Sequence, residues 1–169
     1  LAINGGEPVR KKRIGYGHQW IDEDDIKAVE DVLRSDYLTC GPATQSAEQM
    51  LCKITGAKHA VLLNSDTSAL HCACVAAGIG PGDEVITTPM TFAASANCAL
   101  YCGARPIFSD IDPETYEIDP ESIRAHITQR TKAVIAVDYT GQAVKVDEIR
   151  EICCEYNLIF IEDAAHSIG

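Results

Sequence analysis

The sequence predicts an α/β fold of three layers, in which a mostly parallel sheet carries helices on both faces. From residue 57 onward, short apolar runs alternate with longer segments of helical periodicity. Several runs are apolar at every position, as in Ala133–Val137, which indicates strands that are buried on both faces. The composition, with 46% hydrophobic and 23% charged residues, is that of a globular chain. Alternating βα units of this kind favour a parallel sheet covered by helices.

The first part of the chain, residues 1–56, is expected to be an irregular arm followed by two helices. Residues 1–20 are rich in glycine and show no apolar period. Asp22 can cap a helix, because acidic residues and then an apolar stripe follow it. A second helix over residues 43–55 should end at Gly56, since glycine is common where helices stop.

The second part, residues 57–169, is expected to form the α/β domain. The expected strands are residues 59–64, 84–88, 105–109, 133–137 and 158–161, and the expected helices are residues 67–77, 91–101, 120–126 and 146–156. Ligands of such sheets bind beyond the carboxyl ends of the strands. The functional residues are therefore expected in the segments 65–68, 89–92, 138–141 and 162–166.

Charge and hydropathy exclude some classes of function. The net charge of −11 argues against a nucleic-acid-binding protein. The single basic run, Arg10–Arg13, is interpreted as a solvated, mobile arm, with attraction of an anionic nucleotide as the alternative. The sequence contains no run of 18 apolar residues, so no membrane span is predicted, and the N-terminus does not resemble a secretory signal. A cytoplasmic location is therefore expected.

The chain has eight cysteines. Their spacing does not suit a tetrahedral zinc site, so no metal is expected. A disulfide scaffold is not expected in a chain with this much apolar core. Most of the cysteines are interpreted as small buried hydrophobic residues in a reducing compartment.

The segment Asn64–Leu70 places small polar residues where a predicted strand meets a predicted helix. Free N–H groups and the helix dipole favour an anion at such a helix start, and Thr67 and Ser68 could add hydroxyl donors. Simple capping of the helix is the alternative. Asp66 would repel a phosphate unless its side chain points away from it.

Two further motifs follow predicted strands. Phe92 could stack on a flat ring, with a place in the core as the alternative. Glu162 and Asp163 follow an apolar strand, where a buried charge needs a partner such as a protonated pyridine nitrogen. The alternatives for Asp163 are capping of the next turn or, with Glu162, a magnesium site. The absence from the sequence of a G-x-x-x-x-G-K-[ST] loop and of a G-x-G-x-x-G turn disfavours nucleotide-hydrolase and dinucleotide sites.

The order and placement of these motifs resemble the DegT/DnrJ/EryC1/StrS family of sugar aminotransferases, which have the aspartate-aminotransferase (type I) pyridoxal-phosphate (PLP) fold. The resemblance covers residues 3–169. It rests on the blocks GYGHQWIDEDDIKAVEDVLRSDYLTCGP, NSDTSALH, GPGDEVITTPMTFAASAN, VDYTGQAVKVDEI and FIEDAAHSIG. The chain is therefore expected to be a truncated large domain of this fold, without the smaller C-terminal domain.

The resemblance implies roles for individual residues. Thr67 and Ser68 would hold the PLP phosphate, Phe92 would stack on the pyridine ring, Asp163 would pair with the ring nitrogen, and His166 would lie near the phenolic oxygen. The implied substrate-binding residues are Tyr16, Asp36, Tyr37, Leu38, Thr39 and Asp66. Two positions depart from the family pattern, because Asp66 replaces a small residue and Cys40 stands where glutamine is common.

The implied activity is transamination of a nucleotide-linked keto-sugar, with glutamate as the usual amino donor, for polysaccharide or glycan biosynthesis. The VDYTGQ and TTPMTFAASAN blocks most resemble enzymes that aminate UDP-linked 4-keto-6-deoxy-hexosamines, as in pseudaminic acid biosynthesis. A homodimer is expected. The Schiff-base lysine of the family is expected beyond Gly169, so no catalytic residue is assigned. The alternatives are a sugar dehydratase, in which histidine replaces that lysine, and a non-catalytic domain that binds a ligand or dimerises.

Overall fold

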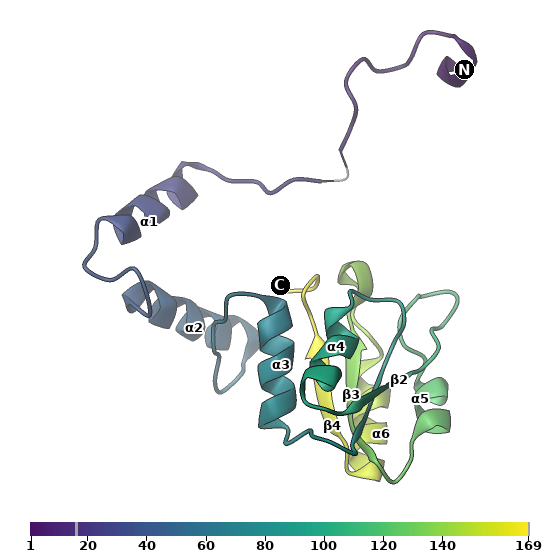
Figure 1. The fold of residues 1–169 in the computed structure, drawn as a ribbon. Helices are drawn as coiled ribbons and strands as arrows, with labels where there is room; N and C mark the ends of the chain where they lie inside the picture. The colour runs from purple at the N-terminus through teal and green to yellow at the C-terminus, as the bar shows by residue number, and fades with distance from the viewer. Residues whose placement is uncertain (16, 169) are drawn as a thin grey trace. The chain divides into compact units, whose positions relative to one another are not determined.

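A computed structural model describes residues 1–15 and 17–168 of the chain (Figure 1). The chain divides into two compact units, Leu1–Ala47 and Glu48–Gly169. Within the described residues, none of the helices combines the length and the apolar character needed to cross a membrane.

The first unit contains a short 3-10 helix, η1 (Ala2–Asn4), and helix α1 (Glu23–Leu33). Asp22 begins α1 through a capping box. Its side chain accepts hydrogen bonds from the backbone N–H groups of Asp24 and Asp25, and the Asp25 side chain accepts one from the N–H of Asp22. The sequence-based prediction of this helix is confirmed.

Helix α2 (Pro42–Thr55) follows, and residues of both units belong to it. It ends at Gly56, whose φ of +74° lies in the left-handed region that glycine adopts without steric cost. The predicted second helix and its glycine stop are confirmed.

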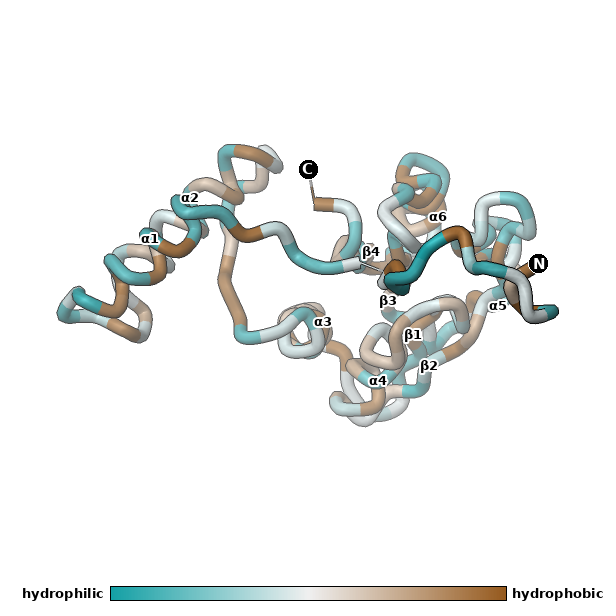
Figure 2. Tube along the Cα trace, turned by 90° about the horizontal axis from the view of Figure 1, so that it is seen from above, coloured by the Kyte–Doolittle hydropathy of each residue, from teal (hydrophilic) through white to brown (hydrophobic). Residues whose placement is uncertain are grey.

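The second unit is a three-layer α/β structure. In chain order, its elements are α3 (Asp66–Ala76), β1 (Glu84–Thr87), α4 (Ala94–Tyr101), β2 (Arg105–Phe108), α5 (Pro120–His126), β3 (Thr131–Val137), η2 (Tyr139–Gly141), α6 (Val146–Tyr156) and β4 (Ile159–Asp163). The four strands are parallel and lie in the order β2-β1-β3-β4. Figure 2 shows α3 and α4 on one side of the sheet and α5 and α6 on the other. The predicted fold class is confirmed.

Successive side chains of the central strand β3 belong alternately to two hydrophobic clusters, one on each face of the sheet. Ala133 and Ile135 pack in the cluster that contains α3 and α4, whereas Val134 and Ala136 pack in the cluster that contains α5 and α6. All four are fully buried, because successive side chains of a strand point to opposite faces and both faces are covered by helices. The continuous apolar run in the sequence has this origin.

One predicted strand is wrong. Residues 59–64 contain no strand in the structure, and the side chains of Val61, Leu62 and Leu63 are exposed by 74%, 41% and 42%. A strand requires a hydrogen-bonding neighbour, and in the described part of the chain this segment pairs with neither edge strand of the sheet. The N–H of Leu62 instead donates to the Glu48 carboxylate at 3.0 Å.

Helix α4 begins at Ala94, three residues later than predicted. Residues 91–93 form a loop before it, and this loop carries Phe92 out of the core. The structure also tests the prediction for the cysteines. Cys74, Cys98 and Cys153 are buried, Cys52 and Cys102 are half-buried, and Cys40, Cys72 and Cys154 are exposed. Only three of the eight are therefore buried, and the expectation that most of them would be is wrong.

Candidate functional site

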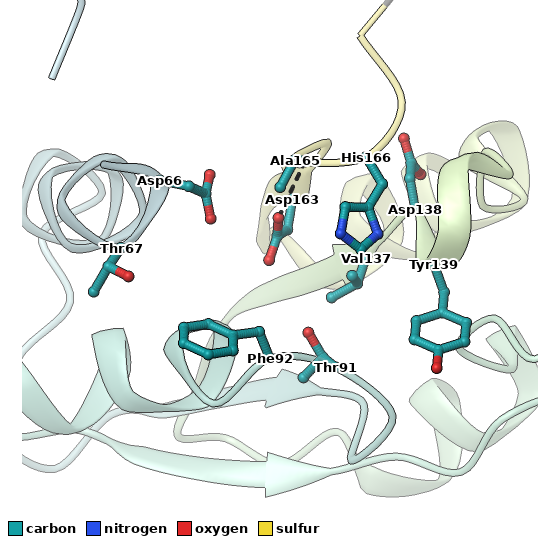
Figure 3. Close-up of a pocket in the computed structure, with 10 residues that line it drawn as sticks. All are labelled: Asp66, Thr67, Thr91, Phe92, Val137, Asp138, Tyr139, Asp163, Ala165 and His166. Atoms are coloured by element: carbon teal, nitrogen blue, oxygen red, sulfur yellow. Dashed lines mark hydrogen bonds between the residues drawn. The ribbon is translucent and has the colours of Figure 1, made fainter. Parts of the chain in front are cut away.

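A cavity of about 490 Å³ lies beyond the carboxyl ends of the strands. It is lined by Asp66, Thr67, Thr91, Phe92, Val137, Asp138, Tyr139, Asp163, Ala165 and His166 (Figure 3). Each of the four segments that the strand-end rule selected contributes to this lining. Ligands of parallel α/β sheets bind at this edge, and the volume of the cavity is in the range of small-molecule binding sites. The cavity is therefore the candidate functional site.

The N-terminus of α3 forms one wall of the cavity. Ser65 caps the helix by accepting a hydrogen bond from the N–H of Ser68 at 3.2 Å. The first N–H groups of a helix have no acceptor within it, so those of Asp66 and Thr67 are available for a ligand. Thr67 also lines the cavity with its side chain, whereas the Ser68 hydroxyl donates to Asn64 Oδ1 at 2.8 Å and is not part of the lining.

Asp66 does not point away from the cavity. Figure 3 shows its carboxylate on the cavity side of α3, directed toward Asp163. Burial raises the pKa of Asp66 above its ordinary value, and the nearby negative charge of Asp163 raises it further. The charge of Asp163 in the same cavity therefore disfavours ionisation of Asp66.

Phe92 is an exposed aromatic side chain, with 76% of its surface accessible. A core phenylalanine would be largely buried, so the structure excludes that alternative. The ring projects into the cavity from the loop that precedes α4 (Figure 3). An aromatic face in this position is available to stack on a flat ligand.

Asp163 is the buried acid of the cavity, with only 5% of its surface exposed. Its Oδ2 accepts a hydrogen bond of 2.7 Å from the hydroxyl of Ser95, and its Oδ1 accepts one of 3.4 Å from the N–H of Ala165. The second contact is the turn cap that the sequence left open as an alternative. Capping and lining of the cavity are thus compatible in this residue.

The loops after β3 and β4 are joined beside the cavity by Asp138, which is also buried. Its Oδ1 accepts from the N–H of Val144 at 3.0 Å, and its Oδ2 accepts from the hydroxyl of Ser167 at 2.5 Å. Gly141 permits a close approach here, because a Cβ on it would lie 3.0 Å from the carbonyl oxygen of His166. These contacts hold the segment that carries His166 against η2.

Not every predicted site residue can be placed at this cavity. Tyr16 lies outside the described residues. Asp36, Tyr37, Leu38 and Thr39 are exposed residues of the first unit, whereas all the residues that line the cavity belong to the second unit.

Sequence reasoning did not single out some residues that the site uses. Among the lining residues these are Thr91, Val137, Asp138, Tyr139 and Ala165. The strand-end rule had selected the segments that contain most of them, but nothing in the local pattern distinguished those members. Ser95, which contacts Asp163 from helix α4, was also missed.

The residues that line the cavity fit the pyridine ring of PLP. An exposed aromatic face and a buried carboxylate meet in one cavity, as a flat cationic pyridine ring requires. Thr67 and the free N–H groups of α3 suit a phosphate, and Asp66 is the one side chain of the set that opposes it. No group of three or more His, Cys, Asp or Glu side chains within residues 1–15 and 17–168 is arranged to hold a metal ion.

Known proteins are similar in sequence to this chain over most of its length. The model of the DegT/DnrJ/EryC1/StrS aminotransferase family matches residues 19–169. The spore coat polysaccharide biosynthesis protein SpsC of Bacillus subtilis is 43% identical over 159 residues, which are 94% of this chain and 41% of SpsC. The UDP-4-amino-4-deoxy-L-arabinose–oxoglutarate aminotransferase of Shewanella sediminis is 44% identical over 149 residues, which are 88% of this chain and 38% of that enzyme.

Solved structures share the fold. The PLP form of a putative sugar aminotransferase from Streptococcus pneumoniae matches with a TM-score of 0.88 and 32% identity, over 94% of this chain and 44% of that one. Helicobacter pylori PseC, an aminotransferase involved in the biosynthesis of pseudaminic acid, matches with a TM-score of 0.86 and 36% identity, over 94% and 43% of the two chains. The chain thus spans about two fifths of the length of these relatives.

Proposed function

Because the chain belongs to the DegT/DnrJ/EryC1/StrS aminotransferase family, we propose that the full-length protein is a PLP-dependent aminotransferase of nucleotide-linked keto-sugars. The observation that carries the proposal is the meeting of Asp163 and Phe92 in one cavity at the carboxyl edge of the sheet. Asp163 is buried, whereas the Phe92 ring is exposed to the cavity. This combination suits a flat, cationic heterocycle better than a sugar or a metal ion.

We assign the following roles on this basis. The carboxylate of Asp163 holds a proton on the ring nitrogen, because a buried anion stabilises a cation beside it. Phe92 covers one face of the ring and excludes water from it. When bound, PLP supplies an electron sink for the bond changes at the amino group. His166, which lines the cavity, would lie beside the ring and would donate a hydrogen bond to its phenolic oxygen.

Thr67 and the first N–H groups of α3 bind the phosphate in this proposal. Ser68 contributes its hydroxyl if it exchanges its present hydrogen bond with Asn64 for one to the ligand. Asp66, Tyr16 and residues 36–39 are proposed to contact the nucleotide-sugar. The lysines of the second unit at positions 53, 58, 132 and 145 do not line the described cavity, so the Schiff-base lysine is proposed to come from residues beyond 169.

The proposed substrate is a UDP-linked 4-keto-6-deoxy-hexosamine, and the proposed amino donor is glutamate. The named relatives support both choices, since one is an oxoglutarate aminotransferase for a UDP-4-amino sugar and another acts in pseudaminic acid biosynthesis. The relation to SpsC supports a place in polysaccharide biosynthesis. We further propose a homodimer and, from the eight free cysteines, a reducing cytoplasmic location.

The test uses the full-length protein, purified with PLP and incubated with glutamate and a UDP-linked or dTDP-linked 4-keto-sugar. We expect an amino-sugar nucleotide and 2-oxoglutarate in equal amounts, detected by mass spectrometry. Asp163→Asn should abolish most of this turnover, whereas Asp110→Asn, at an exposed position outside the cavity, should leave it unchanged. Loss of water from the sugar without amination would instead favour the dehydratase alternative.

A further inference from the structure

A buried hydroxyl lies behind the acid of the cavity. The Ser95 side chain, fully inaccessible to solvent, donates a hydrogen bond of 2.7 Å to Asp163 Oδ2. The two residues are 68 positions apart, one in helix α4 and the other at the end of β4. Ser95 does not line the cavity, so it can influence a ligand only through other residues.

A second hydroxyl, that of the cavity-lining residue Thr91, lies next to Ser95. Thr91 Oγ1 and Ser95 Oγ are 2.7 Å apart, and the carbonyl oxygen of Phe92 lies 3.2 Å from Ser95 Oγ. A serine has only one hydroxyl proton, so it donates fully to one acceptor at a time. The carboxylate is the stronger acceptor because it is charged. The favoured order of donation therefore runs from Thr91 to Ser95 and from Ser95 to Asp163.

The Asp163 carboxylate is held by a hydrogen bond on each of its two oxygens. Oδ2 is held by Ser95, and Oδ1 accepts from the N–H of Ala165. A buried carboxylate without such donors would be costly and free to turn. With both contacts made, the remaining lone pairs of Asp163 keep a constant direction, and Asp163 lines the cavity.

We propose that Ser95 is a positioning residue that aims the Asp163 carboxylate at the ring nitrogen of PLP, with Thr91 orienting the Ser95 hydroxyl. The inference rests on the proposed function, since it requires PLP in this cavity. It assigns a role to a residue that contacts neither cofactor nor substrate. A purely structural role, in which Ser95 only joins α4 to β4, is the competing explanation.

The two explanations differ in how Ser95 affects two ligands. One ligand is PLP, and the other is its 1-deaza analogue, in which C–H replaces the ring nitrogen. The unsubstituted full-length protein should bind PLP more tightly, because only PLP offers Asp163 a ring N–H. In Ser95→Ala, this preference for PLP should shrink about tenfold, the size expected for one hydrogen bond to a charged group. Affinity for the deaza analogue should stay unchanged.

Ser109→Ala is the matched control. Ser109 is also fully buried, and its hydroxyl has no hydrogen-bond partner in the described structure, so this variant removes a buried serine oxygen without touching Asp163. Its preference for PLP over the analogue should equal that of the unsubstituted protein. Thr91→Val, which keeps the shape of the side chain, should lower the preference in the same direction as Ser95→Ala but by less. Thermal unfolding of each apoprotein establishes that the variants are folded.

The outcomes separate the two proposals. If Ser95→Ala lowers the affinity for both ligands equally, or changes only the melting temperature, the positioning role is wrong and the proposed function stands. If the unsubstituted protein binds neither ligand, the proposed function itself fails and the role of Ser95 fails with it. A preference that falls in Ser95→Ala and persists in Ser109→Ala supports the inference.

Discussion

The hydroxyl of Ser167 donates a hydrogen bond of 2.5 Å to Asp138 Oδ2, and through it the loop after β4 is tied to the loop after β3. Asp138 also accepts from the buried backbone of Val144. Removing this carboxylate leaves a buried N–H without its acceptor. We therefore expect Asp138→Ala to lower the free energy of unfolding by about 2 kcal/mol, and Ser167→Ala by about 1 kcal/mol.

Urea unfolding followed by circular dichroism measures both values. Glu151→Ala, at an exposed position of α6, is the control and should change the free energy of unfolding by less than about 0.5 kcal/mol. An unfolding midpoint of Asp138→Ala equal to that of the unsubstituted protein would show that the junction of the two loops adds nothing to stability.

The parts of this fold that could be predicted are those with a local cause. The helix start at Asp22 and the strand formed by the apolar run Ala133–Val137 each depend on residues that are close together in the sequence, and both the helix and the strand were predicted. Residues 59–64 look like a strand by the same local criteria. Whether they form one depends on a neighbouring strand, which no local pattern reports.

The site divides in the same way. Placement after a predicted strand selected Thr67, Phe92 and Asp163. For Phe92 and Asp163 the reason holds, because β1 and β4 are parallel strands whose carboxyl ends lie together. The strand predicted before Thr67 is absent, and Thr67 reaches the cavity from the start of α3. The hydrogen bond between Ser95 and Asp163 joins the start of helix α4 to the end of strand β4, which are distant in sequence. Helix α4 consists mostly of small residues, and nothing in its sequence indicates that Ser95 contacts the acid of the cavity. Side-chain direction, as for Asp66, likewise required the structure.

Phe92 offers a test of the cavity that should leave folding intact. Its ring is mostly exposed, so Phe92→Ala removes little buried surface. We expect the melting temperature of the apoprotein to stay nearly constant while the dissociation constant for PLP rises about tenfold, from loss of stacking. Phe108→Ala, an exposed phenylalanine that does not line the cavity, is the control for both measurements. Unchanged PLP affinity in Phe92→Ala would contradict the stacking role.

Glu84, at the amino end of β1, should make stability depend on pH. Thr128 Oγ1 donates to its carboxylate at 2.6 Å, and Arg130 Nη2 donates at 2.6 Å. The hydrogen bond from Thr128, followed by that from Arg130, holds the pKa of Glu84 below its ordinary value. A lowered folded-state pKa stabilises the protein above the ordinary value for glutamate, and this contribution is lost as the pH falls through the folded-state pKa.

Glu84→Gln should therefore lower the urea midpoint at neutral pH, and its difference from the unsubstituted protein should shrink as the pH falls below the ordinary pKa of glutamate and through the lowered folded-state pKa. Glu114→Gln, at an exposed position, supplies the baseline for loss of one negative charge. PLP affinity should not change in Glu84→Gln, because Glu84 begins the strand whose other end faces the cavity. A difference from the unsubstituted protein that stayed constant with pH would show that ionisation of Glu84 is not its source.

Asp66 should limit cofactor affinity at neutral pH. Burial and the charge of Asp163 raise its pKa, so its neutral form persists to higher pH than that of an ordinary aspartate. Once ionised, it repels a phosphate bound at the start of α3. We expect Asp66→Asn to bind PLP about threefold to tenfold more tightly at neutral pH, the size of one partly screened charge interaction.

The sign of the pH dependence follows from the raised pKa. As the pH falls through the pKa of Asp66, the carboxylate becomes neutral and the affinity of the unsubstituted protein should approach that of Asp66→Asn. The PLP phosphate titrates in both proteins, so the ratio of their dissociation constants isolates Asp66. Fluorescence titration of each protein with PLP across this range, with Asp147→Asn at an exposed position of α6 as the control, measures the ratio. Weaker binding by Asp66→Asn at neutral pH would instead mean that the carboxylate accepts a hydrogen bond from the ligand, which would make Asp66 a recognition group and not a repulsive one.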